Sequence, residues 1–560
     1  MADDPRAASL LKRFSTLQQQ RLHWESHWQE IADFIIPRKA DITKTRTPGD
    51  KRTDLVYDGT AIHAAELMSA SLHGMLTNAA TRWFSLRFGD DTLNGDDEAK
   101  EWLGSATDVV YQHLNRSNFS EQVHELYTDL VTFGTGVLFI EADGRDGVRF
   151  STRHIAECWI SEDEHGRVDT VYRKYKTTAR ATVNQFGKNV SQRIKKFDEE
   201  DPYKEIEILH VVMPRDDREK GKRNKKNKPF ASIYIDPEVK QIIGEGGYDE
   251  LPYCVPRFLK ASFELGYGRS PSMTALADTK MVNKMSEIVI RAAQLQIHPP
   301  LMVPDDGFML PVRTQPGGLN FYRSGTRDRI EPLNIGANNP LGEAQLESRR
   351  TAIRAAFYVD QLILGQGPQM TATEVVQRTE EKMRLLGPVT GRLQVELLQP
   401  CLDRVFAILA RQKQFTPAPE GLRDNQIDIE YVSPLAKAQR SGDVSSAMQM
   451  VEILMPLMQL DPNIVDYLDT DGLVKHIIKV TGVPAEIVRG EGEIAEIREQ
   501  KAAAAEQQQQ MAGVSQMAEA AGAAAPAMRA ATDPAMAESM AGLDEADMES
   551  MSELVAEGAA

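Results

Sequence analysis

The first apolar residues of the chain recur at helical spacing. Leu10, Leu17, Trp24 and Ile31 lie seven residues apart, and Pro37 follows them as a helix breaker. A residue seven positions further along an α-helix returns to nearly the same face, so this spacing predicts one long amphipathic helix that ends before Pro37.

Three further one-sided patterns predict helices before the spacing of apolar residues changes. They run from Thr60 to Met75, from Trp102 to Leu114 and from Phe119 to Val131. After Gly136, apolar and polar residues alternate as in half-buried strands. The predicted strands cover residues 137–142, 148–154, 168–175, 205–213 and 231–236. The first 255 residues therefore predict helices followed by a sheet.

A strong helical pattern returns in the middle of the chain. Ser270 and Pro271 form a cap and a first-turn proline, and His298-Pro299-Pro300 ends the helix. One face is apolar and consists of Met273, Leu276, Met281, Met285, Ile288, Ala292 and Leu295. Residues 298–340, rich in Pro and Gly, predict a small irregular β unit, and a second helix is expected over 341–364. Together they suggest a hairpin-like stalk, which cannot bury its apolar face alone.

The segment Gly365–Met370 interrupts the helical pattern, because its glycines and proline favour a loop. Thr371-Ala372-Thr373-Glu374 then has the spacing of a capping box, which predicts a new helix to about Gln412. Gly387-Pro388 and Pro400 each remove an internal hydrogen bond and are expected to bend this helix.

The C-terminal part begins with an alternating strand pattern at Ile427–Val432 and continues with short helices over 434–490. Residues 491–560 form a low-complexity tail with 14 acidic and three basic residues, so the tail carries −11 of the formal net charge of −17. The first 490 residues carry the remaining −6, which disfavours a basic nucleic-acid-binding protein. The tail lacks apolar bulk, so residues from about 519 onward are expected to be mobile.

Composition adds limits on the class of protein. Of the 560 residues, 41% are hydrophobic and 26% charged, which is globular and leaves room for roughly three or four domains. Cys158, Cys254 and Cys401 are odd in number and include no Cys-x-x-Cys pair, so no disulfide framework or cysteine zinc site is expected. The acidic start and the lack of a long apolar stretch favour an intracellular, soluble protein.

No motif marks a catalytic or metal site. No G-x-x-x-x-G-K-[ST] string occurs, and Phe133-Gly134-Thr135-Gly136 is better explained as a strand-entry turn than as a phosphate loop. His23 and His27 are one helical turn apart, but packing or exposure is favoured over metal binding because no third ligand is evident. The basic segment Arg215–Lys228 is either a solvated hairpin tip, the favoured interpretation, or a phosphate-contacting finger. We expect that the protein is not an enzyme and that it binds no cofactor or metal.

Three strings resemble the portal, or head-to-tail connector, proteins of short-tailed bacteriophages. They are YDGTAIHAAELMSASLHGMLTNAATRWFSL (57–86), GYGRSPSMTALADTKMVNKM (266–285) and QMTATEVVQRTEEKMRLLGPVTGRLQVELLQP (369–400), and the similarity extends from about residue 10 to 490. The resemblance implies an α+β, predominantly helical portal fold with wing, stem, clip and crown. It also implies a homo-oligomeric ring of about twelve subunits.

The same resemblance assigns the segments of the chain. It makes residues 1–265 the wing, 266–297 the stem helix, 298–340 the clip, 341–364 a second stem helix and 365–370 the tunnel loop. Residues 371–433 would form a long kinked helix and a return strand to the wing, 434–490 the crown, and 491–560 an acidic tail in which a barrel helix precedes disorder.

Three sets of site residues follow from this assignment. In the tunnel loop, Gln366, Gln369 and Met370 are expected to face axial DNA; the alternative is a turn buried between subunits. In the stem, Lys280, Lys284 and Arg291 share one face and can steer DNA; the alternative is a solvated outer face with Glu287 as a partner. In the clip, Arg313, Arg323, Arg327 and Arg329 either contact acidic partners or pair locally with Asp328 and Glu331.

The resemblance predicts a portal channel at one capsid vertex that packages and ejects double-stranded DNA without sequence specificity. The expected partners are other copies of the chain, the terminase motor, a tail adaptor, and capsid and scaffold proteins, with no membrane. The protein would be assembled in the host cytoplasm and end in the virion. A nearly neutral body suits sliding DNA, because many phosphate contacts would hold it tightly. Two rivals are a tail or scaffold adaptor without an axial channel and a DNA-packaging enzyme, which the missing phosphate loop and metal cluster disfavour.

Overall fold

The computed structural model describes most of the first 431 residues and little beyond them. The described ranges are 4–47, 49–89, 97–145, 147–219, 224–261, 264, 266–298, 300–302, 331–332, 340–362, 386–418 and 427–431, together with 450, 472, 474, 494 and 497–501. The chain divides into the units Met1–Gly482 and Val483–Ala560, and the elements below belong to the first unit.

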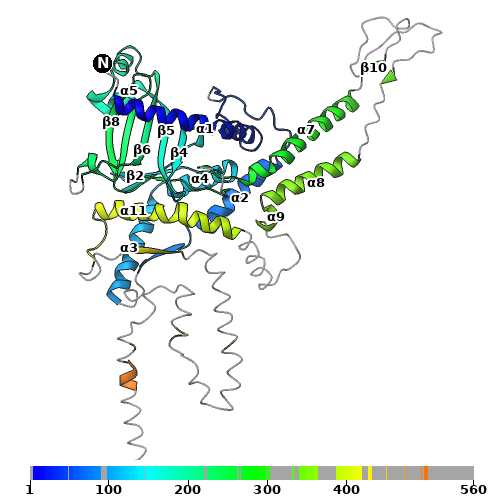
Figure 1. The fold of residues 1–560 in the computed structure, drawn as a ribbon. Helices are drawn as coiled ribbons and strands as arrows, with labels where there is room; N and C mark the ends of the chain where they lie inside the picture. Colours follow the sequence, from blue (N-terminus) through cyan, green and yellow to red (C-terminus); the bar gives the residue numbers. More distant parts are fainter. Residues whose placement is uncertain are drawn as a thin grey trace, which may run out of the picture. The chain divides into compact units, whose positions relative to one another are not determined.

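The four predicted N-terminal helices are present (Figure 1). They are α1 (Pro5–Ile35), α2 (Thr60–Leu76), α3 (Asp97–Arg116) and α4 (Phe119–Phe133). Helix α1 begins at Pro5, directly after the N-cap residue Asp4. The Asp4 side chain accepts a hydrogen bond from Arg6 N at 3.0 Å. The short 3-10 turn Pro37–Lys39 follows α1, so the predicted end before Pro37 is confirmed.

The sheet region forms two antiparallel sheets. The larger has the order β4-β5-β6-β7-β8, and its strands are Cys158–Glu162, Val168–Thr178, Glu205–Pro214, Phe230–Asp236 and Gln241–Tyr248. The smaller has the order β3-β2-β9, with strands Gly147–Thr152, Leu138–Asp143 and Tyr253–Cys254. The five predicted strands are confirmed. The sequence did not predict β4, β8, β9 or the two short helices α5 (Ala179–Phe186) and α6 (Gln192–Glu200).

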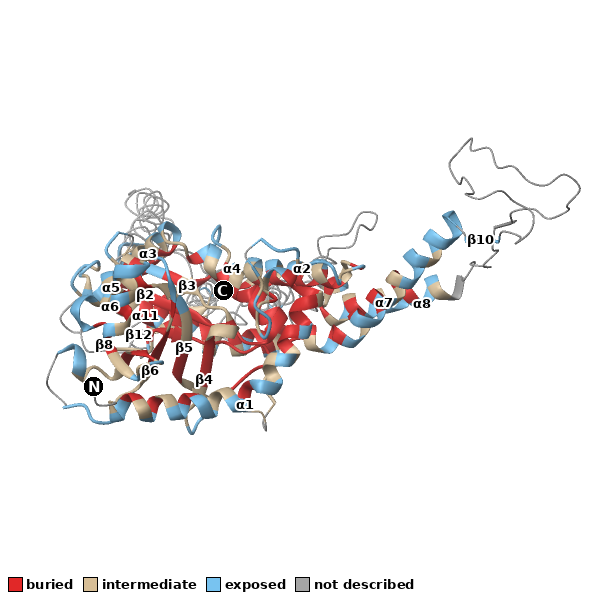
Figure 2. Cartoon of the chain, turned by 90° about the horizontal axis from the view of Figure 1, so that it is seen from above, coloured by how far each residue is buried: buried red, intermediate tan, exposed pale blue. Residues whose placement is uncertain are grey.

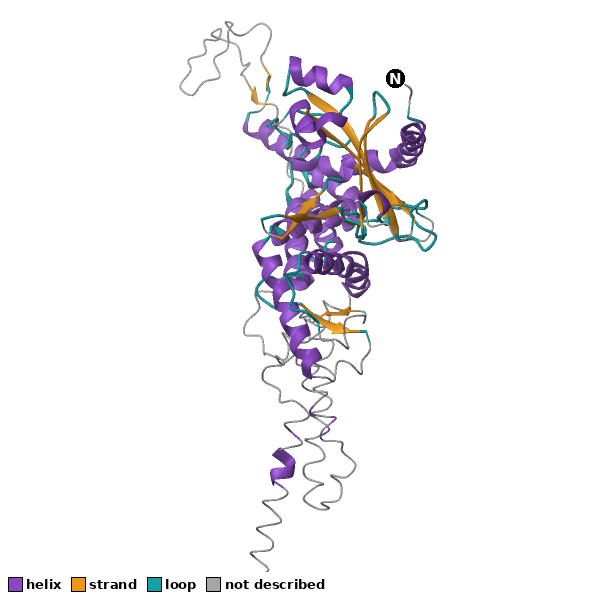
Figure 3. Cartoon of the chain, turned by 90° about the vertical axis from the view of Figure 1, so that its left-hand side faces the viewer, coloured by secondary structure: helices purple, strands orange, loops and turns teal. Residues whose placement is uncertain are grey.

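Helices lie on both faces of the larger sheet (Figure 3). Side chains that alternate along β6 pack against different helices on these two faces. Leu209 and Val211 join a cluster with Leu10 and Phe14 of α1. Ile206 and Ile208 join Ile194 of α6 on the other face. The main core lies elsewhere, among α2, α3, α4, the smaller sheet and the helix after residue 386.

The predicted stalk is present as two adjacent helices (Figures 1 and 2). Helix α7 covers Pro271–Ile297, and α8 covers Pro340–Ala356. The short strands β10 (Leu301–Met302) and β11 (Glu331–Pro332) pair antiparallel between them. The second helix does not run unbroken to residue 364 as predicted. It stops at Ala356, Tyr358 has a φ of 55°, and α9 (Val359–Leu362) follows.

The C-terminal helical run is described from residue 386. Residues 386–393 are helical, Gln394–Leu398 form a wide π-turn, and α11 covers Gln399–Arg411. In the wide turn, Gln399 N donates to Gln394 O, five residues back. Pro400, directly after it, has no N–H to continue the α-helical pattern, so the disturbance predicted there takes the form of a wide turn.

The predicted strand near residue 430 is confirmed as β12 (Ile427–Tyr431), which pairs antiparallel with β1 (Phe84–Phe88). Within the described ranges, no helix is long and apolar enough to cross a bilayer.

Candidate functional site

The predicted site residues fall inside and outside the described parts of the chain. The tunnel-loop residues Gln366, Gln369 and Met370 and the clip residues Arg313, Arg323, Arg327 and Arg329 lie outside the described residues. The stem residues Lys280, Lys284 and Arg291 are described and lie exposed on α7.

Each stem cation has a carboxylate partner. Lys280 Nζ lies 3.1 Å from Glu30 Oε1, while Lys284 and Arg291 contact Glu287 at 2.9 and 2.6 Å. The hydrogen bond from Lys284, followed by the charge of Arg291, lowers the pKa of Glu287. These pairs partly neutralise the basic face, and DNA steering by it stays a prediction.

The buried side of α7 consists mostly of small and polar residues, and Leu276 is its largest apolar side chain. Ala275, Thr279, Val282 and Asn283 are buried, mostly near the start of the helix. Beyond Ser286 the helix is exposed except at Glu287 and Ala292, which are half-buried (Figure 2). Several large apolar side chains therefore face water, with exposed fractions of 48% for Met281, 56% for Ile288, 48% for Val289, 43% for Leu295 and 72% for Ile297.

The start of α7 is hydrogen-bonded to the end of α4. Ser270 Oγ accepts from Met273 N at 3.2 Å, as an N-cap, and donates to Thr132 O at 2.7 Å. Ser272 Oγ donates to Val131 O at 2.8 Å. The two hydroxyls thus satisfy carbonyl groups at the C-terminus of one helix while one of them caps the next. We call this junction the α7 root.

A second set of contacts joins α7, α8 and the segment before α2. Asn283 Oδ1 accepts from Tyr57 N at 2.8 Å and from Asp58 N at 3.1 Å. Arg350 on α8 donates to Asp58 Oδ2 at 2.7 and 2.9 Å. Burial favours the neutral acid, but hydrogen bonds from Thr60 and then Arg350 outweigh it, so the pKa of Asp58 is lowered. Asp58 therefore stays charged. Its backbone N binds α7 through Asn283, and its carboxylate binds α8 through Arg350.

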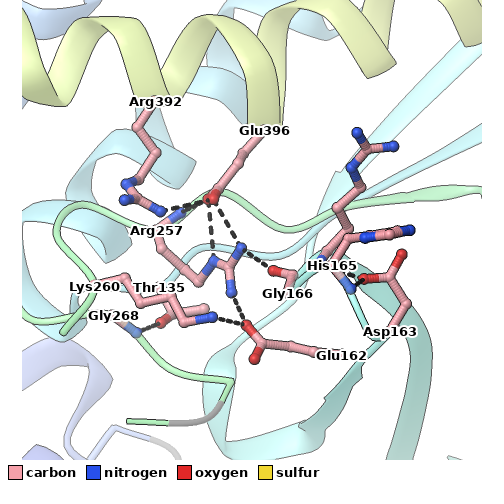
Figure 4. Close-up of polar contacts among 11 residues, drawn as sticks. Thr135, Glu162, Asp163, His165, Gly166, Arg257, Lys260, Gly268, Arg392 and Glu396 are labelled. Carbon is pink, nitrogen blue, oxygen red and sulfur yellow. Dashed lines mark hydrogen bonds and ion pairs between the residues drawn. The ribbon is translucent and has the colours of Figure 1, made fainter. Parts of the chain in front are cut away.

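Beside the α7 root, Figure 4 shows a cluster of charged side chains around the buried Arg257. Arg257 contacts Glu396 at 2.7 Å and is also paired with Glu162, and its guanidinium donates to Gly166 O at 3.0 Å. Lys260 contacts Glu162 at 2.6 Å, and Arg392 contacts Glu396 at 3.0 Å. The Arg257 side chain is only 3% exposed, so its charge is compensated by these two carboxylates rather than by water. We call the five charged residues, Arg257, Glu162, Glu396, Lys260 and Arg392, the Arg257 cluster.

The Arg257 cluster joins three segments of the chain, and a fourth is attached to it through Thr135. Glu162 and Gly166 belong to the β4–β5 hairpin, Arg257 precedes the α7 root, and Glu396 lies in the wide turn. Thr135, after α4, pairs with Arg257 as an isolated β-bridge and accepts from Gly268 N at 2.8 Å. The sequence did not predict this cluster. Arg257 is 95 positions from Glu162 and 139 positions from Glu396, and no local motif links residues so far apart.

The other candidates have structural explanations. Gly134 ends α4 in the left-handed conformation, so the strand-entry turn is confirmed at residues 133–136. The basic segment 215–228 connects β6 to β7 as a hairpin, with Arg215 bound to Glu245 at 3.1 Å and Lys228 to Asp249 at 2.7 Å. Among the described residues, no group of three or more His, Cys, Asp or Glu side chains is placed to hold a metal. The cysteines at 158, 254 and 401 are free and buried.

Two portal proteins of bacteriophages are similar to this chain over most of its length. The chain is 30% identical over 511 residues to a probable portal protein of Bordetella phage BPP-1, covering 89% of this chain and 91% of that protein. It is 30% identical over 500 residues to a portal protein of Salmonella phage epsilon15, covering 87% and 90%. A solved structure of the neck of an empty GTA particle, computed with C6 symmetry, aligns at 12% identity with a TM-score of 0.36, over 72% of this chain and 90% of that one.

A family model extends over most of the chain. The model of the bacteriophage head to tail connecting protein matches residues 7–488, which cover the elements described above from α1 to β12 except the first two residues of α1. This match and the two portal relatives confirm the resemblance stated from the sequence. The chain therefore belongs to the bacteriophage head-to-tail connecting proteins, a family of structural portal proteins.

Proposed function

We propose that the protein forms a ring at one vertex of the capsid and that double-stranded DNA passes through this ring during packaging and ejection. The ring would also be the platform on which the packaging motor, the tail and the capsid and scaffold proteins dock. In this proposal the protein is a component of the virion and has no reaction of its own.

The observation that carries the proposal is the exposed apolar half of α7. Met281, Ile288 and Leu295 lie seven residues apart, so they line one side of the helix over about 21 Å. A single protomer leaves them in water, although burying one large apolar side chain stabilises a protein by about 1.5–3 kcal/mol. Contact with a neighbouring copy would remove them from water, and a head-to-tail contact that closes by rotation gives a ring.

The experiment compares two matched variants of the full chain. Ile288→Glu places a charge in the exposed stripe, whereas Gln296→Glu places the same charge at an exposed polar position of α7. We expect rings with a central hole in projection images of the parent protein and of Gln296→Glu, and mostly monomers of Ile288→Glu. Monomers or dimers of the parent protein at all concentrations would contradict the proposal, and a closed assembly without a hole would favour the adaptor alternative.

The charges on α7 are compatible with DNA passage. Glu287 offsets one of the two charges of Lys284 and Arg291, and Glu30 offsets Lys280, so these pairs leave one net positive charge on this face of each protomer. A channel lined in this way would let DNA slide without a deep electrostatic well. We assign the uncharged loop residues Gln366, Gln369 and Met370 to contact with the duplex, and the clip arginines to acidic partners.

The loop assignment has its own test. Shortening residues 366–369 to a minimal glycine linker is expected to preserve ring formation and to lower the amount of DNA packaged or retained. Heads filled normally by intact rings would contradict the assignment while leaving the ring proposal untouched.

A further inference from the structure

We propose that the exposed stripe of α7, formed by Met281, Ile288 and Leu295, binds the loop before α2 of the neighbouring copy. The receiving surface consists of Leu55, Tyr57 and the pocket beside them. A head-to-tail contact joins two different surfaces, so a stripe on one copy needs a partner surface elsewhere on the next. The inference rests on the ring of the proposed function and supplies the second surface of its subunit contact.

The loop before α2 carries two exposed apolar side chains next to a pocket. Leu55 is 48% exposed and Tyr57 is 44% exposed. Tyr57 also lines a pocket of about 520 Å³, together with Ala64 and Leu67 of α2 and Val359 of α9. The basic residues that line the same pocket, His63, Arg350 and Arg354, each contact a carboxylate. A tyrosine beside a pocket is a common centre of binding energy in contacts between proteins.

The loop is held in place at both ends. Its described residues between 41 and 59 form neither helix nor strand. Near its start, Gln29 Oε1 of α1 accepts from Thr43 N at 2.8 Å. Near its end, Asn283 Oδ1 of α7 accepts from Tyr57 N at 2.8 Å. Long connections without secondary structure usually serve binding, and a loop that is already ordered loses less entropy when it binds.

The stripe and the loop lie on opposite sides of α7 at nearly the same height. Asn283, which binds the loop, is about 160° round the helix from Met281 and about 140° from Ile288. Met281 and Asn283 are only about 3 Å apart along the helix axis. One protomer can therefore present the stripe to one neighbour and the loop to the other. Such a contact adds little rise from copy to copy, which favours a closed ring over an open filament.

The charges beside the two surfaces are opposite. Asp54, directly before Leu55, is exposed, and no other residue in the described part of the chain forms a hydrogen bond or ion pair with its carboxylate. Lys284 and Arg291 flank the stripe and share Glu287, so they keep one net positive charge. Opposite charges would thus meet at the edge of the apolar contact and favour this pairing of surfaces.

The test is thiol cross-linking of the full-length protein with a short bis-maleimide. The three native cysteines are buried, so the reagent reads the added surface thiols. In Leu55→Cys/Ile288→Cys, each copy carries both halves of the contact. We expect a ladder of covalent oligomers up to the complete ring on a denaturing gel, whereas either single variant can give at most dimers. Tyr57→Cys/Met281→Cys provides a second pair at one height and should give the same ladder.

The matched control is Leu22→Cys/Ile288→Cys. Leu22 is 58% exposed and also lies beside a pocket, but no residue of α7, α8 or α9 is among the described residues that line it. This variant should give no ladder. Rings in projection images of the test variants without a ladder would overturn the inference and leave the ring proposal intact, and an equal ladder in the control would also overturn it. Absence of rings in the parent protein would instead contradict the proposed function, and the inference with it.

Discussion

Gly134 and Gly268 meet backbone to backbone where α4 ends and the chain approaches α7. A methyl group on either residue would overlap the carbonyl oxygen of the other. Gly134 also has a φ of 79°, which residues with a side chain rarely adopt. This close crossing brings Gly268 N within 2.8 Å of Thr135 Oγ1 and so helps to fix the α7 root.

Replacement of Gly268 by alanine is expected to lower the free energy of unfolding by about 3 kcal/mol or more, because backbone atoms must move apart. The control is Gly104→Ala in α3, where an added methyl group meets no atom within 4 Å. There the change should raise stability by about 0.5–1 kcal/mol, since alanine favours a helix. Urea unfolding measures both. Equal effects of the two substitutions would show that the crossing tolerates a side chain.

Arg21 offers a test of a buried cation. It donates to the carbonyl oxygens of Ile155, Ala156 and Cys158, and its side chain is only 2% exposed. Arg21→Met leaves these carbonyls without their donor, so we expect a loss of about 3–5 kcal/mol in unfolding free energy. The exposed, paired Lys280 is the comparison, and Lys280→Met should cost about 1 kcal/mol or less. A loss below 1 kcal/mol for Arg21→Met would contradict the assigned role.

His210 makes stability depend on pH. Burial, and then the charges of Arg173 and Arg153, lower the pKa of His210 to about 3. In the unfolded chain this histidine binds a proton near its ordinary pKa of about 6.5. Between that pH and about 3, the unfolded chain therefore carries a proton that the folded protein does not bind. Stability is therefore complete above pH 6.5 and falls as the pH decreases from about 6.5 toward 3.

The variant His210→Gln removes this proton uptake. It should flatten the dependence of unfolding free energy on pH between about 6.5 and 4, a difference of a few kcal/mol at the acid end. Thermal or urea unfolding at several pH values measures the slope. An unchanged slope in a folded variant would mean that another group controls the acid sensitivity.

Glu287 gives a prediction for the basic face of α7. Glu287→Gln would free Lys284 and Arg291 from their shared partner, so we expect tighter, more salt-dependent binding of double-stranded DNA. The slope of log affinity against log salt should steepen by up to about 2 for each protomer that contacts DNA. Lys284→Gln combined with Arg291→Gln should change binding little. DNA binding that is insensitive to all these changes would place the face away from DNA.

Local signals in the sequence predicted the boundaries of α7 well. Ser270-Pro271 marks its start and His298-Pro299 its end, and both signals act within a few residues. The break at Tyr358 was not predictable in this way, because a tyrosine with positive φ is imposed by its surroundings rather than by its own preference.

The contacts that fix the site depend on long-range placement. Thr279 and Asn283 are buried on α7, whereas Ile288 is exposed, so the apolar pattern identified the helix but not the side that the protomer covers. Glu396 and Arg257 are 139 residues apart, and only the folded chain brings them together. The family resemblance gave the overall assignment, but it did not identify this pair.

The serines of the α7 root and Asn283 also set the mechanical accuracy of the far end of the helix. Asn283 binds the segment before α2, so it fixes α7 at a second point, about 20 Å from Ser270. The helix continues for about 21 Å from Asn283 to Ile297 and acts as a lever over that length. A tilt of about 5° around Asn283 would displace the end near Ile297 by about 2 Å. Any force applied at that end would return to Asn283 and the serines as a torque that grows with the length of the arm.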